Sequence, residues 1–210
     1  MKRVVWGILG TARIATAKVI PAMQKSDWID VRAIASRSES AARQAAGKLH
    51  IPRAYGSYDA LLADPEIEAV YNALPNHLHV PLTLQAAAAG KHVLCEKPIA
   101  LSAEEAAQLR SVAGKVHIME AFMVRFHPQW LRARELVRSG RIGELRAVQV
   151  FFSYYNDDAA DIRNKMDTGG GALYDIGCYG IASGRFLFET EPRRAVALVE
   201  RDPAELRTPS

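Results

Sequence analysis

The 210-residue sequence contains only two cysteines, Cys95 and Cys178. They form no CxxC pair and show no other spacing typical of metal ligands. We interpret both as reduced thiols and predict a cytoplasmic protein.

Long hydrophobic runs are also missing, and no stretch approaches the length needed to cross a membrane. The N-terminus, MKRVVWGILG, combines a basic pair with an apolar run. That run is too short for the core of a signal peptide, and no small-residue cleavage site follows it. We therefore expect neither export nor membrane association.

The sequence carries no strong excess of one charge, since its formal net charge is +4. The densest basic stretch includes Glu135 and Glu144 among five arginines, which are Arg132, Arg134, Arg138, Arg141 and Arg146. No RNA- or DNA-binding motif accompanies it, so we interpret it as a solvated helix face rather than a nucleic-acid site. A mildly positive protein would suit an anionic dinucleotide.

In the first part of the chain, short apolar runs alternate with amphipathic helical segments. This pattern predicts an α/β domain with a doubly wound parallel sheet and crossover helices. The predicted strands are 4–9, 29–35, a short strand or turn at 52–58, 69–74, 92–95 and 116–120. The predicted helices include 39–49, 59–62, 77–89 and one that begins with the capping box of Ser102 and Glu105.

The pattern changes near residue 121. Beyond it we expect helices over 127–139 and from Gly169 to Phe188, separated by a long alternating strand, 145–155. Such a strand cannot cover its own apolar face and needs a larger sheet or a partner. We thus predict a Rossmann domain at 1–121 and a partial α+β substrate or oligomerisation domain at 122–210. The polar segment 200–210 adds no further strand.

The turn after the first predicted strand occupies the place of a dinucleotide fingerprint. Of its three glycines only Gly10 is present, with Ala12 and Ala15 in the other two places. A tight turn and small residues let a pyrophosphate approach the N-terminus of the following helix. We expect Gly10, Thr11, Ala12, Arg13 and Ile14 to bind a cofactor, although an ordinary strand–helix turn would look similar.

The second predicted strand ends at Ser36 and Arg37, without the acidic residue that an NAD site would normally have there. A hydroxyl and a guanidinium can bind a 2′-phosphate, which a carboxylate would repel. This favours NADP over NAD. The alternative is a polar turn with an exposed arginine.

Two further groups of residues are candidates to act on a substrate. Lys97 follows a buried strand, so it lies at the carboxyl edge of the sheet, where ligands of open α/β folds bind. Asp175 and Tyr179 are four residues apart, on one face of the predicted helix. The simpler alternatives are a solvated lysine, a packed tyrosine and a charge near a helix N-terminus.

Together these segments resemble the Gfo/Idh/MocA family of oxidoreductases. The resemblance rests on GILGTA at 7–12, GKHVLCEKP at 90–98 and GGGALYDIGCY at 169–179. Residues 120–123 and 125–128 are similar to the glucose-fructose oxidoreductase, D-xylose dehydrogenase and dimeric dihydrodiol dehydrogenase branches. The resemblance covers about residues 2 to 190. The family usually has another long strand-rich stretch, and its absence here is the main departure.

The resemblance implies roles for several residues. Lys97 would be the active-site lysine, with a cis bond to Pro98, and Tyr179 takes the place of the catalytic His or Tyr. Asp175 would bind a substrate hydroxyl, and Arg163 would line the pocket. The cofactor segments would include Leu74, Pro75, Asn76, His79, Glu96 and Lys97 itself. Phe122, Phe152 and Tyr154 could form apolar walls, while His77 and His79 lack the further ligands of a metal site.

The implied chemistry is hydride transfer between NADP and a secondary alcohol or carbonyl of a cyclic polyol. A free tyrosine titrates near pH ~10, and a nearby ammonium such as Lys97 would favour the ionised form needed to exchange the substrate proton. The substrate would be a sugar such as D-xylose or glucose, or a trans-dihydrodiol. The alternative is an NADP-binding sensor without turnover, or an inactive fragment. The apolar face of 145–155 would allow a homodimer through the second-domain sheet.

Overall fold

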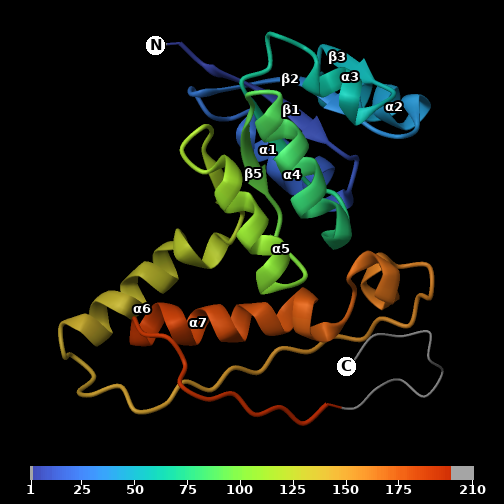
Figure 1. Ribbon diagram of the computed structural model, residues 1–210. Coiled ribbons are helices and arrows are strands. Elements are labelled where there is room, and N and C mark those ends of the chain that lie inside the picture. Colours follow the sequence, from blue (N-terminus) through green and yellow to red (C-terminus); the bar gives the residue numbers. More distant parts are fainter. Residues whose placement is uncertain (1, 200–210) are drawn as a thin grey trace. The chain divides into compact units, whose positions relative to one another are not determined.

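The computed structural model describes residues 2–199, and the chain forms two compact units that meet in sequence between Ala121 and Phe122 (Figure 1). The polar segment 200–210 lies outside the described residues. No helix within 2–199 has the length and apolar character needed to span a membrane.

The first unit is built on a sheet of six parallel strands, which confirms the predicted fold class. The order β3-β2-β1-β4-β5-β6 reverses direction between β1 and β4, so this is a doubly wound Rossmann sheet with its switch point there. The strands are β1 (Val4–Leu9), β2 (Ile29–Ala35), β3 (Arg53–Tyr55), β4 (Ala69–Asn72), β5 (His92–Cys95) and β6 (Ile118–Glu120).

Helices connect these strands, and three of them begin at a serine whose hydroxyl accepts a backbone N–H bond. Ser38, Ser57 and Ser102 cap α2, α3 and α5 in this way. At α5 the carboxylate of Glu105 accepts the N–H of Leu101 rather than that of Ser102, so the expected capping box is shifted by one residue. The helical segments are η1 (Ala15–Val19), α1 (Ile20–Met23), α2 (Glu39–Leu49), α3 (Tyr58–Leu62), η2 (Asn76–Leu78), α4 (His79–Ala88), α5 (Ala103–Gln108) and η3 (Leu109–Val112).

The core consists of two apolar layers, one on each face of the sheet. Neighbouring residues of a strand enter opposite layers, as Ile8 and Leu9 of β1 do. The layer of Leu9 contains residues of α3 and α4, and the layer of Ile8 contains residues of α1 and α2. Burial on both faces explains why the strands are short, nearly continuous apolar runs in the sequence.

The described part of the second unit is helical, with α6 (Pro128–Arg138) in contact with α7 (Cys178–Phe188). Arg134 of α6 lies over the ring of Phe186 at 4.2 Å, and Arg138 donates a 2.9 Å hydrogen bond from its Nε atom to Glu189. The shorter segments are η4 (Met123–Arg125), η5 (Ile162–Asn164), η6 (Met166–Thr168) and η7 (Leu173–Gly177).

The long strand predicted at 145–155 does not form. Residues 122–199 contain no strand, and 145–155 run as an irregular segment with Phe151 and Tyr155 89% and 86% exposed. An alternating pattern indicates which face a strand would bury, but a strand also needs a hydrogen-bonded neighbour. The helix expected from Gly169 begins later, with the π-helical segment η7.

Candidate functional site

The turn after β1, expected to bind a cofactor, is tight and depends on a glycine. Gly10 has a φ of +95°, and a Cβ atom there would lie 2.8 Å from Cδ2 of Leu74. Only glycine meets both demands without strain. The turn leads directly into the helix containing Ala15 at the switch point of the sheet, and the first N–H groups of a helix favour an anion. Thr11, Ala12, Arg13 and Ile14 occupy this turn and the start of the helix.

Ser36 and Arg37 follow β2, next to this turn in the sheet order. The Ser36 hydroxyl accepts the N–H of Ser38 at 3.2 Å, and Arg37 is exposed. Burial raises the pKa of Tyr58, while a hydrogen bond and the charge of Arg37 lower it, so the phenol of Tyr58 lies beside the guanidinium. The sequence reasoning missed Tyr58, which is 21 residues further along the chain.

Leu74, Pro75 and Asn76 follow β4 on the other side of the switch point. Leu74 is buried, while Pro75 and Asn76 are partly exposed. Asn72 at the end of β4 holds this segment, because its Oδ1 atom accepts the N–H of Leu74 and its Nδ2 atom donates to the carbonyl of His79. This segment therefore joins the Gly10 turn at the carboxyl edge of the sheet.

His79, expected among the cofactor-binding residues, contacts two backbone carbonyls of the first unit. Its side chain is completely buried, with Nε2 2.8 Å from the carbonyl oxygen of Leu74 and Nδ1 2.6 Å from that of Pro98. Burial lowers the pKa of His79, although the two carbonyls and the charges of Glu96 and Glu120 act in the opposite direction. The ring joins two loops of the protein and presents neither nitrogen to a ligand.

Lys97 follows β5 at the same edge, and its bond to Pro98 is cis. The preceding Glu96 is held by a hydrogen bond from the buried hydroxyl of Tyr71. Burial and the neighbouring Glu96 carboxylate both raise the pKa of Tyr71, so this phenol stays protonated and acts as a donor. Tyr71 was another residue without a sequence signal for its role.

In the second unit, Asp175 lies at the centre of a polar cluster. Its carboxylate accepts a hydrogen bond from the hydroxyl of Tyr154 and another from Nε of Arg163, the latter at 3.4 Å. Arg163 also pairs with Asp161 at 3.3 Å. The sequence predicted Asp175 and Arg163 as substrate contacts, and the structure brings them together. Tyr154 was expected as an apolar wall, but its hydroxyl is a polar partner of Asp175.

The glycine run before α7 makes this cluster possible. The N–H of Gly171 donates to the carbonyl of Arg163 at 2.8 Å, and that of Gly170 donates to the carbonyl of Lys165 at 2.9 Å. A Cβ atom on Gly170 would lie 2.5 Å from the Arg163 carbonyl oxygen. The missing side chain thus lets η5 pack against the start of the helix that carries Asp175.

Tyr179 lies one turn beyond Asp175 and packs against two aromatic residues. Its ring centroid is 5.1 Å from that of Phe122 and 6.1 Å from that of Phe152, and both pairs are tilted. Phe122 is 5% exposed and Phe152 is 52% exposed. The second unit therefore places the phenol of Tyr179 and the carboxylate of Asp175 on neighbouring helical turns, with the guanidinium of Arg163 bonded to that carboxylate.

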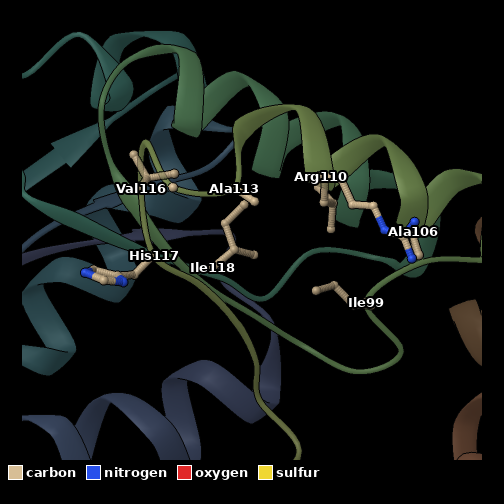
Figure 2. Close-up of a pocket in the computed structure, with 9 residues that line it drawn as sticks. Ile99, Ala106, Arg110, Ala113, Val116, His117 and Ile118 are labelled. Carbon is tan, nitrogen blue, oxygen red and sulfur yellow. The ribbon is translucent and has the colours of Figure 1, made fainter.

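A shallow pocket of about 420 Å³ lies elsewhere in the first unit, between α5, η3 and β6 (Figure 2). It contains none of the expected site residues, and most of its lining is apolar. Its lining residues are Ile99, Ala106, Leu109, Arg110, Ala113, Gly114, Val116, His117 and Ile118. Across residues 2–199, no three His, Cys, Asp or Glu side chains gather as metal ligands would.

The sheet order, the glycine turn and the residues at the carboxyl edge define the first unit as a dinucleotide-binding Rossmann domain. Comparison with protein families gives the same class. Residues 4–125 match the NAD-binding Rossmann domain of the Gfo/Idh/MocA oxidoreductases, and residues 130–208 match a C-terminal domain of that family. The chain belongs to the Gfo/Idh/MocA family.

Several relatives align over most of the chain. It is 53% identical over 206 residues to an uncharacterised oxidoreductase, ORF334, of Rhizobium meliloti, covering 97% of the chain and 61% of the relative. It is 48% identical over 191 residues to a D-xylose 1-dehydrogenase (NADP(+)) of Haloferax volcanii, covering 90% and 58%. A crystal structure of a 3-ketoreductase from Actinomadura kijaniata with NADP and TDP-benzene superposes with a TM-score of 0.83 at 37% identity, covering 89% and 58%. The chain thus spans about three-fifths of the length of these relatives.

Proposed function

We propose that this protein is an NADP-dependent oxidoreductase that interconverts a secondary alcohol and a carbonyl on a cyclic polyol. The observation that carries the proposal is the carboxyl edge of the first unit, where the Gly10 turn, the Ser36–Arg37 pair and the Lys97 loop follow neighbouring strands of one sheet. The relatives named for D-xylose 1-dehydrogenase and 3-ketoreductase activity support the same reaction class.

The residues of the first unit fit a phosphorylated dinucleotide. Gly10 forms the tight turn at the N-terminus of the first helix, where backbone N–H groups can donate to a pyrophosphate. Ser36 and Arg37 supply a hydroxyl and a guanidinium for a 2′-phosphate. When bound, the cofactor would supply or accept the hydride.

The residues of the second unit fit a substrate rich in hydroxyl groups. Asp175 can accept a hydrogen bond from one hydroxyl, and Arg163 can donate to another oxygen. We assign to Tyr179 the proton that leaves or returns to the reacting oxygen, and to Lys97 the positive charge that favours its ionised form. A sugar such as D-xylose or glucose, or a trans-dihydrodiol, has the required arrangement of neighbouring hydroxyls.

The test has two stages. NADPH binding is measured by its fluorescence, and turnover is then followed with pentoses, hexoses and dihydrodiols in the presence of NADP or NAD. Tyr179→Phe should lower kcat by at least roughly 100-fold, because general acid–base catalysis contributes about that much or more. Tyr174→Phe, a tyrosine of the same helical segment with no assigned role, is the matched control and should remain active.

Two results would reject parts of this proposal. Undiminished turnover by Tyr179→Phe would show that another group exchanges the proton. Tight NADPH binding without turnover of any substrate would instead favour a nucleotide-binding protein that does not catalyse the reaction.

A further inference from the structure

The backbone that follows Lys97 is anchored by side chains from two other elements. The carbonyl oxygen of Pro98 lies 2.6 Å from Nδ1 of His79, at the start of α4. The N–H of Ile99 donates a 2.8 Å hydrogen bond to Oε1 of Glu120, the last residue of β6. Two consecutive residues after the lysine are therefore held from outside their own loop.

The residue before Lys97 is anchored as well. Tyr71 donates a hydrogen bond to Oε1 of Glu96, and the N–H of Lys97 lies 3.3 Å from Oε2 of the same carboxylate. Strands β4 and β6, which flank β5 in the sheet, thus both send a side chain to this loop. The arrangement holds the residues on both sides of Lys97.

Of these anchors, Glu120 can be altered with the least disturbance. His79 and Tyr71 are completely buried, so their removal would leave cavities in the core, whereas Glu120 is partly exposed at the end of a strand. Glu120 itself has no role in the proposed function. Its hydrogen bond spans 21 residues of the chain.

We propose that Glu120 is a positioning residue for Lys97, acting through the peptide group of Ile99. This inference rests on the proposed function, in which the ammonium of Lys97 must occupy one place at the carboxyl edge. A lysine side chain has four rotatable bonds, so a fixed backbone reduces the number of positions that its ammonium can reach. Displacement by about 1 Å can cost roughly 100-fold in rate, which gives this anchor a measurable effect.

The activity test compares three variants. Glu120→Ala removes the acceptor of the Ile99 N–H bond, and Glu120→Gln retains an oxygen at the same place. Glu105→Ala is the matched control, because Glu105 accepts the N–H of Leu101 at 2.9 Å, two residues further along the same loop. We expect Glu120→Ala to lower kcat by roughly 10- to 100-fold with KM and the Kd of NADPH nearly unchanged, and the other two variants to stay within about threefold of the original protein.

A spectroscopic test does not depend on turnover. Reductive methylation with ¹³C-formaldehyde labels the lysines, and the signal missing from Lys97→Arg identifies Lys97. We expect its chemical shift to change in Glu120→Ala and to return in Glu120→Gln, while Glu105→Ala leaves it in place. If the proposed function is wrong, NADPH binding or turnover fails in the original protein, yet this signal still reports on the position of Lys97.

The inference is overturned by an unchanged Lys97 signal in Glu120→Ala. It is also overturned if Glu120→Gln behaves like Glu120→Ala, or if Glu105→Ala causes an equal loss of kcat. In those cases the hydrogen bond between Ile99 and Glu120 would stabilise the loop as a whole and would not determine the position of Lys97.

Discussion

The hydroxyl of Tyr154 donates a hydrogen bond to the carboxylate of Asp175, 21 residues further along the chain. Burial, the hydrogen bond to Asp175 and the charge of that carboxylate together raise the pKa of Tyr154 to about 12. Tyr154 is therefore a neutral donor at any pH at which the enzyme would work. In the proposed reaction it orients Asp175 and leaves proton exchange to Tyr179.

Replacement of Tyr154 by phenylalanine tests this division of roles. Loss of a hydrogen bond to a charged group costs about 1.5 kcal/mol, so KM for the polyol should rise roughly tenfold while kcat changes little. Steady-state kinetics give both constants. Tyr155→Phe is the control, because this neighbouring tyrosine is 86% exposed and bonds to Asp157 instead. A large fall in kcat for Tyr154→Phe would show that Tyr154, and not Tyr179, exchanges the proton.

Gly170 provides a test of how the polar cluster is assembled. In Gly170→Ala the new Cβ atom would lie 2.5 Å from the backbone oxygen of Arg163, so the backbone must move. We expect the free energy of unfolding to fall by about 1–3 kcal/mol, as for other overpacked sites. Gly184→Ala is the matched control, because Gly184 lies inside α7 with no atom within 4 Å of the added Cβ.

Chemical denaturation of the two variants should give opposite results. Gly184→Ala should stabilise the protein by roughly 0.5–1 kcal/mol, since alanine is the better helix former. Equal stability of Gly170→Ala and the original protein would mean that the close approach of η5 to the glycine run is not needed for folding.

Much of the first unit could be predicted from the sequence, because buried parallel strands are visible as short apolar runs and their ends locate the carboxyl edge. This is why Gly10, Ser36, Arg37 and Lys97 could be placed there in advance. The side chains that support the site were less visible. Tyr71 reaches Glu96 across 25 residues, and Glu120 reaches Ile99 across 21, so no local spacing indicates either contact.

In the second unit, sequence periodicity predicted less of the structure. The alternation over 145–155 predicts a strand, but strand formation depends on a hydrogen-bonded neighbour that the local sequence does not specify. The spacing of Asp175 and Tyr179 did place them on neighbouring turns. It did not reveal Tyr154 as a partner of Asp175, because that contact depends on the path of an irregular segment.

Asp64 should make the stability of the first unit depend on pH. Burial opposes its ionisation, but hydrogen bonds from the N–H of Glu66, from Tyr55 and from Arg53 lower the pKa of this carboxyl below its usual value. A lowered folded-state pKa contributes stability above the unfolded pKa of about 3.9, and this contribution is lost as the pH falls through the folded value.

The variant Asp64→Asn isolates this effect. Near neutral pH it should lose about 2 kcal/mol of stability, as expected for hydrogen bonds to a buried charged group. The difference from the original protein should shrink as the pH falls below about 4, because the carboxyl becomes protonated first in the unfolded chain and, at lower pH, in the folded protein. Asp27→Asn, at a side chain that is 97% exposed, should show no comparable difference at any pH. A constant difference for Asp64→Asn down to low pH would contradict the lowered pKa.

The choice between NADP and NAD can be tested at the end of β2. Arg37→Ala removes the exposed guanidinium beside Tyr58, and charge-assisted hydrogen bonds to a phosphate are worth about 1.5–3 kcal/mol. We therefore expect the Kd of NADPH to rise at least roughly tenfold while the Kd of NADH, which lacks the 2′-phosphate, changes by less than about twofold. Fluorescence titration with each nucleotide measures both constants.

A second substitution should reverse the preference. Ser36→Asp introduces a carboxylate that repels a 2′-phosphate and accepts hydrogen bonds from a ribose 2′-hydroxyl, so the variant should bind NADH more tightly than NADPH. Arg43→Ala, at an exposed arginine of α2 that is paired with Glu39, removes the same charge away from the turn and should leave the ratio of the two Kd values unchanged. If Arg37→Ala weakens the binding of NADPH and NADH equally, this arginine contacts a part of the nucleotide that both share. The preference for NADP must then arise from other residues.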